Sequence, residues 1–166
     1  MKYFTRSWHS GDFDDKTANE IASSYRQVLE DISRTMPLPI KQLATEIDVH
    51  DAIIERVVVG EAGRKLSISL VAGDRSVGYY GVEIAYERAQ IKGHDLDILK
   101  RRARDRSTCI LYQEIDREKN GRYVQRILFW PEDEIEISFD NIRLLVTSRE
   151  GRCVELVGYF VEEHDE

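Results

Sequence analysis

Short segments rich in Val, Ile and Tyr, separated by turn signals, most constrain what this chain can fold into. Segments of this kind with period-two alternation are typical of β-strands. They fall into two sets of three, over 52–59, 65–72 and 78–87, then over 109–117, 122–130 and 134–147. A last strand is expected near 153–162. Hairpins are expected at 61–64 and at 119–121, where Asn-Gly accepts the positive φ of a tight turn.

The two sets of strands resemble each other in sequence. Residues 82–87 read Val-Glu-Ile-Ala-Tyr-Glu, and residues 135–140 read Ile-Glu-Ile-Ser-Phe-Asp. The match predicts two copies of a three-stranded antiparallel meander. The alternative is that alternating strands resemble one another by chance.

A helix is expected from Asp14 to about Thr35. Its apolar residues recur at spacings of three and four and so share one face. This face consists of Ile21, Tyr25, Val28, Leu29 and Ile32. Asp12 or Asp14 can cap the start of the helix. Prolines at 37 and 39 end it, and a short second helix is expected over 39–46.

These patterns predict a single α+β domain over residues 1–166. Residues 1–46 are expected to be mainly helical, and residues 47–166 mainly antiparallel β with a short helix near 95–104. The N-terminal amphipathic helix would pack on one face of an antiparallel sheet of six to seven strands, which accounts for its single apolar stripe. The length suits one hydrophobic core.

The charge balance argues against some partners. The net charge is -7, with 31 acidic and 24 basic side chains. Nucleic-acid binding depends on neutralising phosphates with Lys and Arg, so no nucleic-acid partner is expected. No apolar stretch matches a signal peptide or a membrane span, so we expect a cytoplasmic protein without a membrane partner. Cys109 and Cys153 are then reduced, buried thiols; a disulfide or a reactive thiol is the alternative.

One basic run, at 100–106, stands out in this acidic chain. Basic residues favour the C-terminal end of a helix, so the run is interpreted as a solvated helix end. The alternative is a surface for an anionic partner or for self-association.

Three His-Asp pairs raise the question of a metal site: His50-Asp51, His94-Asp95 and His164-Asp165. His-Asp phosphohydrolases hold their metal between helices, whereas here the first pair precedes a long β region, so that function is rejected. His50 and Asp51 could still join Glu114 or another acid in a metal or ligand site, although a metal needs about three or four ligands. The alternative is structural, with Asp51 capping a turn and His50 packing on the sheet edge.

Other catalytic motifs are absent from the sequence: it has no Gly-rich phosphate loop, nucleophile elbow, C-x-x-C or H-E-x-x-H. We therefore expect no cofactor. Alternation places Glu134 and Glu136 on the outer face of a strand. An exposed patch that combines aromatic and acidic residues, around Phe129, Trp130 and Glu132, would indicate a protein interaction.

Three short motifs resemble a bacterial family classed as a domain of unknown function. They are Met1-Lys2-Tyr3-Phe4-Thr5-x-x-Trp8, the central His50-Asp51-Ala52, and Leu111-Tyr112-x-Glu114-Ile115. The resemblance implies a bacterial source and brings no activity with it.

A looser likeness is to small bacterial immunity proteins, which are acidic, single-domain and α+β. Such proteins neutralise a toxin by covering its active site. An acidic surface suits that role when the toxin is a basic nuclease, because complementary potentials steer the two together.

The sequence thus predicts a non-enzymatic protein-interaction module, with another protein or a second copy of itself as partner. The alternative is a small-molecule or metal-binding protein, or a hydrolase of an unrecognised type, with its site at His50 and Asp51. The candidate binding residues are His50, Asp51, Tyr112, Glu114 and Trp130.

Overall fold

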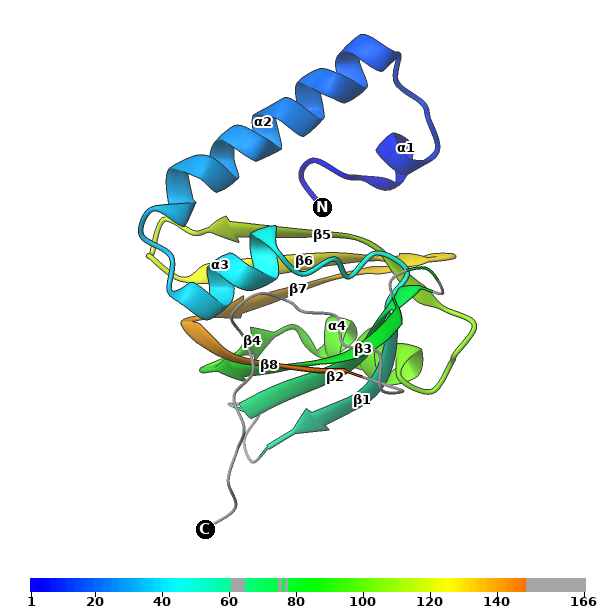
Figure 1. The fold of residues 1–166 in the computed structure, drawn as a ribbon, viewed down its shortest axis with the longest axis vertical. Coiled ribbons are helices and arrows are strands. Elements are labelled where there is room, and N and C mark those ends of the chain that lie inside the picture. The colour runs from blue at the N-terminus through cyan, green and yellow to red at the C-terminus, as the bar shows by residue number, and fades with distance from the viewer. Residues whose placement is uncertain (61–64, 75, 77, 149–166) are drawn as a thin grey trace.

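The computed structural model describes all residues except 61–64, 75, 77 and 149–166. In the described residues, eight strands form two four-stranded sheets, and four helices accompany them (Figure 1). The α+β class with antiparallel sheets is therefore confirmed. The prediction of one sheet with six to seven strands is wrong.

The first sheet has the order β1-β2-β3-β8 and the second has the order β4-β7-β6-β5. The first sheet comprises β1 (Ile53–Val59), β2 (Lys65–Asp74), β3 (Gly78–Glu87) and β8 (Asn141–Ser148). The second comprises β4 (Gln90–Ile91), β5 (Cys109–Arg117), β6 (Tyr123–Trp130) and β7 (Glu134–Phe139). Each predicted set, β1-β2-β3 and β5-β6-β7, pairs as an antiparallel meander. The last strand predicted, near 153–162, lies outside the described residues.

Two sheets form because the chain bends twice between layers. β3 continues into β4 after a corner at Arg88, which has a positive φ of 51°. β7 continues into β8 through Asp140 alone, so the predicted strand 134–147 is in fact two strands. The two corners are joined, because the Asp140 amide donates to the Glu87 carbonyl (3.1 Å) and the Asp140 carboxylate pairs with Arg88 and Arg122.

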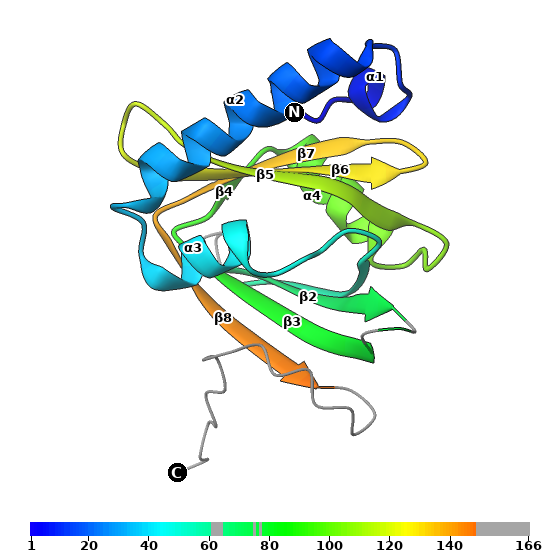
Figure 2. The same cartoon turned by 45° about the horizontal axis from the view of Figure 1, so that its top comes forward.

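The hydrophobic core lies between the two sheets. It is built from the inward-facing residues of both layers, such as Leu66, Ile68, Ile84, Ile115, Ile127, Phe129, Ile137 and Phe139. Helix α3 (Leu38–Thr45) spans the space between the layers (Figure 2) and adds the fully buried Ile40 and Leu43. The short helix predicted over 39–46 is thus the one that enters the core.

The long predicted helix is α2 (Asp15–Ser33), capped by Asp14, whose carboxylate accepts from the Thr17 amide (2.7 Å). It lies on the outer side of the β5-β6-β7 layer (Figure 1), and Tyr25 is its one buried residue. The Tyr25 hydroxyl accepts from the Ile115 amide (2.7 Å) and donates to the Ile115 carbonyl (3.4 Å). Because Ile115 is in β5, at the edge of its sheet, α2 protects a strand edge as well as covering a face.

Two short helices complete the described chain. Helix α1 (Arg6–His9) follows an N-terminal stretch that lies on the same outer face as α2 (Figure 2). Helix α4 (Gly93–Arg102) matches the short helix expected near 95–104 and packs against β7. In the residues described, no helix is long and apolar enough to cross a membrane.

Candidate interaction site

Six rings from distant parts of the sequence meet at one end of β5. Tyr112 is at the centre, and its ring centroid lies 5.2 Å from Trp8, 5.5 Å from His50, 5.7 Å from Phe4 and 5.8 Å from His9. Trp130 joins through His9, at 6.2 Å. Three of these five pairs are edge-to-face, a favourable geometry for aromatic rings, and the other two are tilted. We call Phe4, Trp8, His9, His50, Tyr112 and Trp130 the aromatic cluster.

Backbone pairing brings the His50-Asp51 pair to this cluster. The Asp51 amide donates to the Ile110 carbonyl (2.8 Å), and the Ile110 amide donates to the Ala52 carbonyl (2.9 Å). Residues 50–52 therefore run along the start of β5 just before they enter β1. His50 also contacts the Leu111 carbonyl through Nδ1, which fixes its ring against Tyr112.

Glu114 fixes the N-terminal segment over the outer face of β5. Its side chain is 1% exposed, and its carboxylate accepts from the amides of Lys2 (2.8 Å), Tyr3 (2.7 Å) and Phe4 (2.8 Å). A buried carboxylate needs such donors, because its charge is costly to remove from water. This predicted ligand residue is thus occupied with internal bonds that position Phe4 in the aromatic cluster.

Glu114 also belongs to an ion-pair network on the outer face of the sheet. Arg126 Nη1 lies 4.0 Å from Glu114 and 3.5 Å from Asp116, and its Nε donates to Glu136 (2.8 Å). Lys2 Nζ also pairs with Asp116. Asp116 is partly buried, which raises a carboxyl pKa, but hydrogen bonds from Lys2 and the Arg117 amide hold the pKa of Asp116 below its usual value.

Asp51 is exposed at the border of the cluster and has a positive φ of 59°. Its carboxylate lies 3.8 Å from His50 Nε2 and 3.7 Å from Cys109 Sγ, with 69% of the side chain exposed. The turn before it is capped by Asp48 instead, which accepts from the His50 amide (2.9 Å). The structural interpretation of Asp51 as a turn cap is therefore wrong, while His50 does pack at the sheet edge.

Cys109, Asp51 and His50 resemble a nucleophilic trio in composition only. Partial burial and the nearby Asp51 carboxylate raise the pKa of the Cys109 thiol. A raised pKa keeps the sulfur protonated, and a protonated thiol is a poor nucleophile. Among the described residues, no group of three His, Cys, Asp or Glu side chains is placed to hold a metal.

Trp130 and His50 are the exposed members of the cluster. Trp130 carries the larger ring. It ends β6, opposite Cys109 in β5, and 49% of it is exposed. The neighbouring Phe129 is 1% exposed because it faces the core, so its predicted place in a surface patch is wrong. Glu132 does lie at the surface, with 77% of its side chain exposed.

The basic run has an internal role. Arg101 and Arg102, at the end of α4, both bind the Asp133 carboxylate in the turn after Trp130. Arg102 is 5% exposed, so the interpretation as a solvated helix end is wrong for this residue. Asp133 also has a positive φ of 75°, and its carbonyl accepts from the Phe129 amide (3.0 Å).

This turn should make stability pH-dependent. Partial burial acts to raise the pKa of Asp133, but hydrogen bonds from Arg101 and Arg102 hold it below its ordinary value. A carboxyl whose pKa is lowered by folding stabilises the fold above its unfolded pKa, and that stability is lost as the pH falls through the folded pKa. Asp133→Asn keeps a residue that tolerates positive φ and removes the charge.

We therefore expect Asp133→Asn to lower the free energy of unfolding by about 1 kcal/mol at neutral pH. The gap from wild type should close as the pH falls below about 4. Urea unfolding of both proteins at a series of pH values measures this difference in the free energy of unfolding. A gap that is constant down to strongly acid pH would show that the charge of Asp133 is not what stabilises the turn.

The second His-Asp pair is structural in part. Asp95 is buried in the first turn of α4, and its carboxylate accepts from the Glu136 amide (3.0 Å). It therefore ties α4 to β7. The third pair, His164-Asp165, lies outside the described residues.

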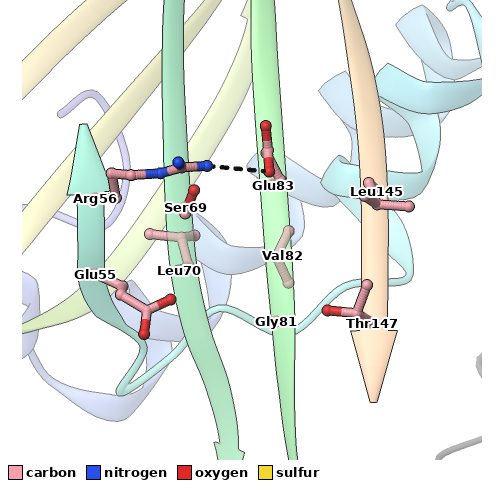
Figure 3. Close-up of a pocket in the computed structure, with 9 residues that line it drawn as sticks. All are labelled: Glu55, Arg56, Ser69, Leu70, Gly81, Val82, Glu83, Leu145 and Thr147. Carbon is pink, nitrogen blue, oxygen red and sulfur yellow. Dashed lines mark ion pairs between the residues drawn. The ribbon is translucent and has the colours of Figure 1, made fainter. Parts of the chain in front are cut away.

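A separate hollow of about 440 Å³ crosses the outer face of the first sheet. In Figure 3, Arg56 on β1 extends over β2 toward Glu83 on β3, and the ion pair measures 3.6 Å. Small residues, Ser69 and Gly81, line the hollow beside this pair. None of the residues that line it is one of the five predicted from the sequence.

Four of those five residues lie at the aromatic cluster or at its border: His50, Asp51, Tyr112 and Trp130. Glu114 is on the same strand but is covered by the N-terminal segment. Sequence reasoning missed Phe4, Trp8, His9 and Cys109 as members of this surface. The density of aromatic residues in the first nine positions was the signal that could have indicated them.

Comparisons with known proteins found no matching family model, no matching curated protein and no matching solved structure.

Proposed function

We propose that this chain is a non-enzymatic interaction module that docks a partner protein through the aromatic cluster. The observation that carries the proposal is the half-exposed Trp130 ring at the border of a packed group of rings. Trp and Tyr are enriched among residues that dominate binding energy, because they bury a large area with few rotatable bonds. The His9 ring, whose centroid lies 6.2 Å from that of Trp130, is the neighbour that orients the exposed ring before binding.

The arrangement around His50 gives less support to a metal or small-molecule site. The His50 Nδ1 atom is bound to the Leu111 carbonyl, and Glu114 is bound to three backbone amides. A metal site would have to replace these bonds or use other ligands. An exposed aromatic surface needs no such rearrangement.

An immunity-like role is compatible with the proposal. The net charge of -7 would steer a basic partner toward the chain. A bacterial toxin with a basic surface is a partner of that kind, and the cluster would be the part of the chain that contacts it.

A photo-reactive phenylalanine derivative at position 130, which keeps an aromatic ring in place of Trp130, tests the docking surface in the source cells. We expect a dominant covalent product from position 130, with one partner, and little product from position 79. Tyr79 is a suitable control because it is 42% exposed and belongs to the other sheet. Equal products from both positions, or none from position 130, would contradict the proposal. A covalent dimer of the chain would identify the partner as a second copy.

A further inference from the structure

We infer that Trp130 and Asp51 together accept an arginine side chain from a basic partner protein. This inference rests on the proposed function and adds the chemistry that the surface recognises. A guanidinium over an indole face is attracted by the ring's negative face, and Trp is the strongest of the aromatic residues in this role. A carboxylate beside the ring supplies the charged partner.

The two groups flank the same residue. Trp130 faces Cys109 across the β5-β6 pair, and the Asp51 carboxylate lies 3.7 Å from the Cys109 sulfur. The position of Asp51 is set by its backbone bond to Ile110, and that of Trp130 by the strand pairing. The backbones of Asp51 and Trp130 are therefore held on either side of Cys109, so ring and carboxylate lie near each other.

The charge of Asp51 acts on its surroundings. The pKa of Cys109 and that of Tyr112 are both raised, first by partial burial and then by the negative charge of Asp51. Both groups thus experience a negative potential that disfavours their own ionisation. The same potential favours an incoming cation.

Three arginines near the cluster are occupied with other partners. The Arg6 guanidinium donates to the carbonyls of Phe129 (2.7 Å) and Pro131 (2.9 Å). Arg101 and Arg102 are bound to Asp133. The Asp51 carboxylate lies 3.8 Å from His50 Nε2 and 3.7 Å from Cys109 Sγ, and both distances are too long for strong hydrogen bonds. Among the described residues Asp51 has no ion pair with a lysine or an arginine, so its charge is available to a cation of the partner.

Arginine suits this place better than lysine. Its planar guanidinium can stack on an indole and pair with a carboxylate through two N–H groups. Lysine offers a compact, strongly hydrated charge that does not stack. A basic protein surface also matches the net charge of the chain.

The experiment uses a labelled oligo-arginine peptide and an oligo-citrulline peptide of the same length. Each peptide is titrated with the full chain at about 0.15 M salt, because this salt screens long-range electrostatic attraction. Fluorescence anisotropy reports binding. We expect the arginine peptide to bind and the citrulline peptide not to bind. Trp130→Leu, which keeps apolar area but removes the ring, should weaken arginine binding about tenfold. Asp51→Asn should weaken it about fivefold.

Two matched variants control for total charge and for exposed rings. Asp31→Asn removes an equal charge near the end of α2, which lies at the other end of the layer from the end of β6 (Figures 1 and 2). Tyr79→Leu removes an exposed ring from the other sheet. Both should change the affinity less than about twofold. Urea unfolding of every variant checks that each one folds.

Equal losses for Asp51→Asn and Asp31→Asn, or unchanged binding by Trp130→Leu, would overturn the inference. The proposed function can fail separately. Partner cross-links at position 130 without arginine binding would keep the docking surface and reject the arginine. Arginine binding at Trp130 without partner cross-links would keep the cation site and reject the docking surface. Cross-links to a second copy of this acidic chain would argue against a basic partner.

Discussion

Replacing Glu114 with alanine is expected to lower the free energy of unfolding by about 3–5 kcal/mol. The change removes the shared acceptor of three backbone amides, at Lys2, Tyr3 and Phe4. It also leaves the largely buried Arg126 with one carboxylate fewer. Phe4 would then lose its fixed place against Tyr112, so the change should loosen the candidate site as well as the fold.

Urea unfolding measures the loss, and hydrogen exchange at residues 2–4 shows whether these amides lose protection. Glu134→Gln is the matched control, because Glu134 pairs with the amine of Met1 and is 57% exposed. An exposed ion pair contributes little, so the control should cost less than about 1 kcal/mol. Equal losses for the two variants would mean that the three amide bonds are not the source of the effect.

Gly73→Ala should be the second most destabilising change, with a loss of about 3 kcal/mol. Gly73 has a φ of +89°, in the region that side chains disfavour. An added Cβ would also lie 2.1 Å from the Gly78 carbonyl oxygen and 3.2 Å from a ring carbon of Tyr80. Backbone cannot move aside there without breaking the β2-β3 pairing.

Gly11→Ala separates the effect of backbone strain at positive φ from the effect of the Cβ collision. Gly11 has a φ of +74°, but an added Cβ would meet nothing within 4 Å. This control carries the backbone strain without the collision, so it should cost about 1 kcal/mol. Urea midpoints of the two variants give the comparison. If Gly11→Ala lost as much stability as Gly73→Ala, the collision with Gly78 would be ruled out as the main cause.

The strands could be predicted because their signal is local. Alternation and turn residues indicated β1, β2, β3, β5 and β6 within a few residues of their observed bounds. The bend at Asp140 could not be found in this way, since apolar alternation continues on both sides of it. One bend of this kind turns a single expected sheet into two layers.

The place of each helix was harder to predict than its existence. Tyr25 and its apolar neighbours indicated a helix that would cover a sheet, and α2 does lie on one. Ile40 and Leu43 belong to α3, which has 8 residues. A helix this short has too few turns for its sequence periodicity to show that it packs in the core. Which helix is buried depends on how the two sheets are arranged. That arrangement depends on contacts between residues far apart in the sequence, so local patterns do not show it.

The candidate site was predicted in part. His50, Asp51, Tyr112 and Trp130 do meet, because residues 50–52 pair with β5. Glu114 is a candidate ligand by its carboxylate, but that carboxylate is bound to backbone amides inside the fold. The contact that decides this, between Glu114 and residues 2–4, joins positions more than a hundred residues apart. No local pattern carries that information.

The two corners have a consequence for how the chain can be divided. The first meander contributes β4 to the sheet of the second, and the second contributes β8 to the sheet of the first. Each half therefore completes the other's layer. A fragment that ended after α4 would leave β3 with an open edge where β8 belongs, and open strand edges pair with other chains. The halves are interlocked, because each supplies an edge strand to the sheet of the other.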